Sequence, residues 1–263
     1  MRLHWLLILF FMATLANAAD LTLQQAIQGP QRSKVFVERD AARHPLAELE
    51  FFGIKPDMSV VEILPSRGYW TEFLAPYLRD RGTYYVAVPP KDNAEGVEGK
   101  DVFRQKLSAD PAVYGKVLVR ELGKGRYDIA PAGSADMVLT FRNVHNWVAG
   151  GFAEEVLAGF YQALKPGGIL GVEDHRARTD VAQDPRAADG YVRQDYVIGL
   201  AKQAGFEFLG SSEINANSKD TKNWPKGVWT LPPSFALGNQ DRARYAAIGE
   251  ADNFVLKFRK PLQ

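Results

Sequence analysis

The feature that most constrains the fold is one stretch in the first third of the chain, VVEILPSRGYWTEFLAPYL at residues 60–78. A short apolar run, a tight loop containing Gly68 and an amphipathic segment follow one another directly. This pattern predicts a buried strand, a turn and a helix, which is how a parallel sheet with helical crossovers begins. An acid, Glu62, lies inside the apolar run near the expected end of the strand.

The rest of the chain continues this alternation. Amphipathic helices are expected at 69–82, 152–168 and 192–205. Short apolar strands are expected at 59–64, 83–90, 117–122, 135–141, 169–175, 206–214 and 254–261. Strands that alternate with helices indicate an α/β fold with a mostly parallel sheet. Ligands of such sheets bind outside the carboxyl ends of the strands, where the strand order reverses.

Composition excludes some classes of partner. The 263 residues carry a formal net charge of +1 and contain no cysteine. No basic run stands out, so a nucleic-acid partner held through its phosphates is not expected. Without cysteine the chain forms no disulfide and has no lipid anchor on an N-terminal cysteine.

The first residues have the features of an export signal. MRLHWLLILFFMATLANAAD combines a basic start, a short apolar run and an A-x-A pattern, which predicts a signal peptide at 1–18 cleaved after Ala18. The product is expected to be periplasmic or secreted, with no stable membrane anchor after cleavage; an uncleaved anchor is the alternative. Residues 19–45 are expected to form a helical extension and 46–263 the main domain, with a lid-like insertion at 215–253 rich in tryptophan and proline.

Four stretches, of which the first contains residues 60–78, carry a resemblance to a known family: GIKPDMSVVEILPSRGYWTEFLAPYL, ADMVLTFRNVHNW, ALKPGGILGVEDHRA and QAGFEF. Over residues 46–258 the chain resembles the class I S-adenosylmethionine (SAM) dependent methyltransferases, and within them a secreted bacterial branch of predicted methyltransferases. The resemblance implies a Rossmann-like, seven-stranded, mostly parallel sheet with an antiparallel last strand and helices on both faces. It also implies SAM as cofactor.

The family's cofactor loop is an acid followed by three alternate glycines. Glu62 matches the acid and Gly68 the last glycine, while Leu64 and Ser66 occupy the first two glycine positions. The resemblance therefore implies that the cofactor is bound by Glu62, Leu64, Ser66, Gly68, Thr71 and Asn143. The family also ends its second strand with an acid that holds the ribose; here Val88 or Pro89 falls at that position, and Asp92 is the nearest acid and could substitute.

Two polar clusters follow the expected fourth and fifth strands. FRNVHNW contains His145, and GVEDHRA contains Asp174 and His175. If these strands are neighbours, the three side chains converge, which suits a histidine general base tuned by a carboxylate. A divalent metal site and plain hydrogen bonding between loops are the other interpretations; we expect no metal.

The sequence thus predicts a methyltransferase that acts on a small-molecule acceptor, with His145, Asp174 and His175 as catalytic residues. A non-catalytic binding protein with a degenerate methyltransferase fold is the alternative. Trp147 either stacks on a ligand or packs in the core.

Overall fold

The computed structural model of the chain describes residues 21–90 and 100–262. It contains one seven-stranded sheet in the order β3-β2-β1-β4-β5-β7-β6. The strands are β1 (Ser59–Ile63), β2 (Thr83–Val88), β3 (Leu118–Glu121), β4 (Ala135–Phe141), β5 (Leu164–His175), β6 (Glu207–Ser212) and β7 (Asn253–Arg259). Six strands are parallel, and β7 lies antiparallel between β5 and β6. The predicted fold class is confirmed.

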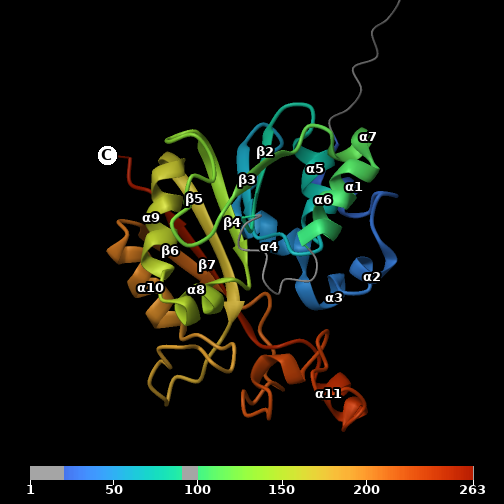
Figure 1. Cartoon of the computed structure of the whole chain (residues 1–263), viewed down its shortest axis with the longest axis vertical. Helices are drawn as coiled ribbons and strands as arrows, with labels where there is room; N and C mark the ends of the chain where they lie inside the picture. The colour runs from blue at the N-terminus through green and yellow to red at the C-terminus, as the bar shows by residue number, and fades with distance from the viewer. Residues whose placement is uncertain (1–20, 91–99, 263) are drawn as a thin grey trace, which may run out of the picture.

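Helices cover both faces of the sheet (Figure 1). One face carries α8 (Val144–Gly150), α9 (Ala153–Ala163) and α10 (Gln194–Gln203). The other face carries α1 (Leu23–Ile27), α4 (Pro45–Phe52), α5 (Thr71–Leu78), α6 (Lys100–Ala109) and α7 (Pro111–Tyr114). The central strands are buried on both faces, which is why β1 and β4 read as continuous apolar runs rather than as alternating patterns.

The remaining elements are short: they are α2 (Lys34–Val37), α3 (Asp40–Arg43), the 3₁₀ turn η2 (Gly227–Thr230) and α11 (Arg242–Ile248). In Figure 1, α2 and α3 lie at the right and α11 lies at the bottom. The segment 215–253 has a small apolar cluster of its own, in which Val228, Leu231 and Tyr245 pack with Tyr191. It therefore forms an ordered cover over the carboxyl edge of the sheet.

The fifth strand begins earlier than the sequence suggests. The Pro-Gly-Gly turn at 166–168 was expected to separate α9 from a strand at 169–175, but β5 begins at Leu164 directly after the helix. Leu164 pairs with Ala135, and the ladder resumes with Ile169 opposite Met137. The turn is therefore a bulge within the strand pairing, and the register of β5 against β4 shifts there.

Trp147 belongs to the core. Its side chain is 1% exposed, and its ring packs edge-on against Phe160 of α9. The interpretation of Trp147 as a ligand-stacking residue is therefore wrong. In the described part of the chain, no helix is both long and apolar enough to cross a membrane. The proposed signal peptide and Asp92 lie outside the described residues.

Candidate functional site

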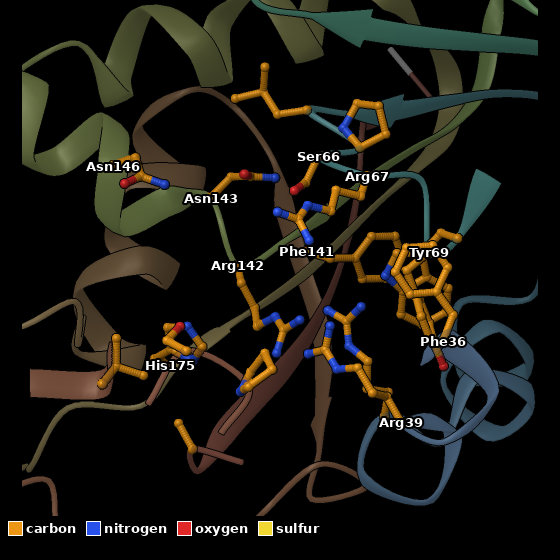
Figure 2. Close-up of a pocket in the computed structure, with 18 of the residues that line it drawn as sticks. Phe36, Arg39, Ser66, Arg67, Tyr69, Phe141, Arg142, Asn143, Asn146 and His175 are labelled. Atoms are coloured by element: carbon orange, nitrogen blue, oxygen red, sulfur yellow. The ribbon is translucent and has the colours of Figure 1, made fainter. Parts of the chain in front are cut away.

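The strand order reverses between β1 and β4, since β2 and β3 lie on one side of this pair and β5 on the other. A parallel sheet opens a crevice at such a point, at the carboxyl ends of the strands. The structure has a cavity of about 690 Å³ there, which lies within the size range of small-molecule sites. The loops that follow β1 and β4 contribute to its wall, together with His175 at the end of β5 (Figure 2).

Two further segments complete the cavity. Phe36, Arg39 and Arg43 of the N-terminal extension form one side, and Trp229 with the two prolines after η2 forms the cover. The extension and the 215–253 segment are therefore parts of the site. Among the described lining residues, none comes from β2 or β3.

The loop after β1 has an unusual backbone. Leu64, Ser66 and Gly68 have φ angles of 47°, 54° and 85°. This left-handed region is disfavoured for residues with a Cβ, and particularly for a bulky one. The three alternate positions at which the resemblance expects glycine therefore all adopt a conformation that glycine prefers, although two of them are not glycine.

Leu64 does not fill the cavity. Its side chain packs against the apolar core that lies under α8 and α9, and the cavity remains open beside Leu64, Ser66 and Arg67. The conformational strain of this loop is of the order of 1–2 kcal/mol for each non-glycine residue. The apolar burial of Leu64 and the anchoring of the adjoining strand and helix offset that strain.

Glu62 is a buried acid at the head of the loop. It is 1% exposed and accepts hydrogen bonds from Thr71 Oγ1, at 2.6 Å, and from the hydroxyl of Tyr84. Burial raises its pKa to about 7, although the two hydrogen bonds lower it. Glu62 therefore changes charge near neutral pH, and a bound cation would favour its ionised form.

His145 and Asp174 form a buried pair. The Nδ1 atom of His145 lies 2.9 Å from Asp174 Oδ1, and the backbone N–H of His145 donates to Oδ2 at 3.0 Å. Burial opposes ionisation of Asp174, but the charge and hydrogen bond of His145 outweigh it and leave the pKa below its usual value. Because an ionised carboxylate only accepts, Nδ1 carries a proton and Nε2 is the atom free to act on a ligand.

His175 lies beside this pair, with its ring centroid 5.4 Å from that of His145. Its Nδ1 lies 2.7 Å from Asn253 Oδ1. Burial lowers the pKa of His175 to about 3, despite the attraction of Asp174. His175 is therefore neutral at physiological pH and contributes a polar, uncharged edge to the cavity wall.

The three residues are close enough to hold a metal ion, since their ligand atoms lie within 4.8 Å of one another. However, Asp174 already accepts three N–H groups, two from His145 and one from the backbone of His175. This arrangement suits a base that is oriented by a carboxylate. The expectation of no metal stays a prediction.

The structure divides the expected site residues into two sets. The cavity is lined by Glu62, Leu64, Ser66, Asn143, His145 and His175. Gly68, Thr71 and Asp174 are not lining residues and lie behind that wall. Thr71 supports Glu62, and a Cβ on Gly68 would lie 3.1 Å from the Phe103 ring of α6. Asn143 donates to the carbonyl of Ile63 at 3.0 Å and so ties the β4 loop to the end of β1.

Sequence reasoning missed the arginines of the extension. Arg39 and Arg43 both line the cavity. Their spacing of four places them on one side of a helical segment, which was the available signal.

The strand order and the switch-point cavity define a Rossmann-like fold. No protein-family model matches the sequence, and no curated protein matches it. Solved structures do match. A SAM-dependent methyltransferase from Aquifex aeolicus has a TM-score of 0.57 at 14% identity, covering 91% of this chain and 98% of that one.

Two more structures show the range of this fold. Phosphoethanolamine N-methyltransferase 2 from Haemonchus contortus, in complex with SAM, has a TM-score of 0.54 at 12% identity, covering 91% of this chain and 60% of that one. The [4+2]-cyclase SpnF has a TM-score of 0.58 at 14% identity, covering 84% of this chain and 81% of that one. Since one of these is a cyclase, the fold alone does not define the reaction.

The left-handed conformation of the loop makes a prediction about Ser66, which is exposed and has a φ of 54°. Ser66→Val should lower the free energy of unfolding by about 1–2 kcal/mol, because a β-branched residue is strained there. Ser66→Gly should leave it unchanged or raise it, since glycine accepts this φ freely. Equilibrium denaturation in urea measures both variants; equal losses for valine and glycine would contradict the observed backbone.

The raised pKa of Glu62 predicts a pH-dependent stability. Between pH 4.5 and about 7 the unfolded chain has lost this proton while the folded chain keeps it, so the contribution of Glu62 to stability falls as pH rises. The free energy of unfolding of Glu62→Gln, relative to that of wild type, should therefore rise by about 3 kcal/mol from the lower to the upper end of this window, at about 1.4 kcal/mol per pKa unit. Urea denaturation at several pH values measures the difference. Glu154→Gln, an exposed substitution on α9, controls for the change from carboxylate to amide. If the difference in free energy of unfolding between Glu62→Gln and wild type does not change with pH, the raised pKa of Glu62 is refuted.

Proposed function

We propose that this protein is a SAM-dependent methyltransferase with a small-molecule acceptor. The observation that carries the proposal is the loop after β1, which has three alternate left-handed residues beside an open cavity at the switch point. The match to SAM-dependent methyltransferases over most of their length supports it. The neighbour with SAM bound supports the choice of cofactor.

The residues present suit the methionine end of SAM. Ser66 and Leu64 would approach it through their backbone, and Glu62 would face the ammonium group. Because its pKa is about 7, Glu62 is readily ionised by a neighbouring cation. The residue at the end of β2 is Val88, which is buried and offers no carboxylate to a ribose.

Bound SAM would supply an electrophilic methyl group, with its sulfur as the leaving group. His145 would accept the acceptor's proton at Nε2, because Nδ1 is held by Asp174. Asp174 keeps the ring oriented and stabilises its protonated form. Trp229 and the prolines after η2 would exclude water from the reacting groups.

A non-catalytic binding protein is the alternative that Val88 favours. A degenerate site is expected to be blocked at Leu64 or Arg67, yet the cavity is open beside both. The pairing of His145 with Asp174 also leaves Nε2 free beside the cavity, which suits proton transfer. We therefore place the enzyme first.

Calorimetric titration tests the cofactor. The folded protein should bind SAM and its demethylated product, S-adenosylhomocysteine. Glu62→Gln should lower the affinity for S-adenosylhomocysteine by about 10–100-fold, because it loses a hydrogen bond to a charged group. Binding of 5′-methylthioadenosine, which lacks the ammonium and carboxylate, should not change. Wild-type protein with a normal circular dichroism spectrum and no heat from either ligand would refute the transferase.

We also propose export from the cytoplasm, on the basis of the first 18 residues. In a bacterial host with a functional secretory pathway, the full chain should be processed to a product that begins at Ala19. Amino-terminal sequencing of the purified protein measures this. An intact N-terminus on a membrane-bound product would favour the uncleaved anchor instead.

A further inference from the structure

We propose that the acceptor carries an anionic group, a carboxylate or phosphate, which is bound by arginines on the cavity wall. This inference rests on the proposed function. Four arginines line the cavity, and we call them the arginine cluster: Arg39, Arg43, Arg67 and Arg142. Figure 2 shows the side chains of Arg39, Arg67 and Arg142 directed into one space between the β1 loop and the extension.

Two members of the cluster share one acid. Arg39 binds Glu250 through Nε and a terminal nitrogen, at 2.7 and 2.8 Å, and Arg142 donates to the same carboxylate at 2.7 Å. Burial disfavours the charge on Glu250, but these arginines outweigh it and lower the pKa to about 2. Glu250 is therefore ionised and fixes both side chains, while their remaining N–H groups stay available.

Arg43 is the most deeply buried member, with only 4% of its surface exposed. Its guanidinium lies 4.4 Å from the centre of the Tyr69 ring, and its nearest acid is Glu173, at 3.8 Å. No protein atom pairs with Arg43 Nε within the described chain. Burial, and then repulsion by Arg142, lower the pKa of Arg43 to about 10. A buried cation with an unpaired N–H is costly unless a further partner is supplied.

The charges do not balance within the protein. The arginine cluster has four positive groups, whereas two carboxylates, Glu250 and Glu173, adjoin it. Glu48, next to Glu173, is held neutral because burial and that neighbour raise its pKa far above the usual value. Arg67 is exposed, and no acid of the described residues forms an ion pair with it. Among the described residues, the four guanidinium groups therefore outnumber their two directly paired carboxylates; Asp174 attracts Arg142 and Glu62 attracts Arg43 without an ion pair.

The cofactor would increase this surplus. SAM has a sulfonium, an ammonium and one carboxylate, so its net charge is +1. An anionic acceptor offsets both the cluster and the sulfonium. Guanidinium groups bind carboxylates and phosphates in a paired, planar geometry, which suits them to hold such a group in one orientation.

The cluster also lies close to the proposed base. Arg142 is three residues before His145 in the β4 loop, and its charge contributes to the low pKa of His175. An anion bound by Arg142 and Arg43 would thus place the rest of the acceptor beside His145, which is the position that proton transfer requires.

Calorimetry with inorganic phosphate as probe tests the proposal. Phosphate should bind to the protein saturated with S-adenosylhomocysteine. Its affinity should fall tenfold or more in Arg142→Gln and in Arg67→Gln, since each substitution removes a charge from the wall. Arg67 is exposed, so that variant keeps the test valid if Arg142→Gln does not fold. Arg178→Gln removes a surface arginine that is paired with Asp180 and should leave phosphate binding unchanged.

The outcomes separate two sources of the anion. If the arginine cluster instead binds the cofactor's own carboxylate, phosphate will compete with S-adenosylhomocysteine. Arg142→Gln will then lower the affinity for S-adenosylhomocysteine and leave the affinity for 5′-methylthioadenosine unchanged. That result, or no phosphate binding at all, overturns the proposal. If phosphate binds to the arginine cluster but S-adenosylhomocysteine does not bind to the protein, the anion site is supported and the proposed methyltransferase function is refuted.

Discussion

The backbone turn between β1 and α5 is the constraint on which the site depends. Leu64, Ser66 and Gly68 all take left-handed conformations, and the crevice stays open beside Leu64, Ser66 and Arg67. The turn places Glu62 at one end and the start of α5 at the other. A sequence that keeps such a strained geometry without its usual glycines retains the shape of the cofactor loop while changing its composition.

The second layer of the site consists of buried charges that orient one another. Asp174 holds His145, and Glu250 holds Arg39 together with Arg142. Each of these acids is ionised despite burial, because the adjacent cation or N–H groups favour its charged form. The extension and the cover contribute to this layer, so the chain's two least regular segments complete the site rather than merely surround it.

Most of the fold could be predicted, because buried parallel strands and amphipathic helices leave a strong periodic signal. The convergence of His145, Asp174 and His175 followed from the pairing of β4 with β5. The start of β5 could not be located, since a Pro-Gly-Gly bulge looks the same as a turn in sequence. Trp147 could not be assigned because core and ligand contacts favour the same side chain. Arg43 was missed because contacts with residues distant in sequence, such as Tyr69 and Glu173, bring the extension to the cavity.

The central claim is that this turn makes room for a cofactor at the carboxyl edge of the sheet. A crystal structure of the protein grown with S-adenosylhomocysteine measures that most directly. The account predicts the amino-acid end of the ligand against the backbone of 64–68, with its ammonium beside Glu62 and the Leu64 side chain still in the core. A ligand bound elsewhere, or a Leu64 side chain turned into the crevice, would contradict it.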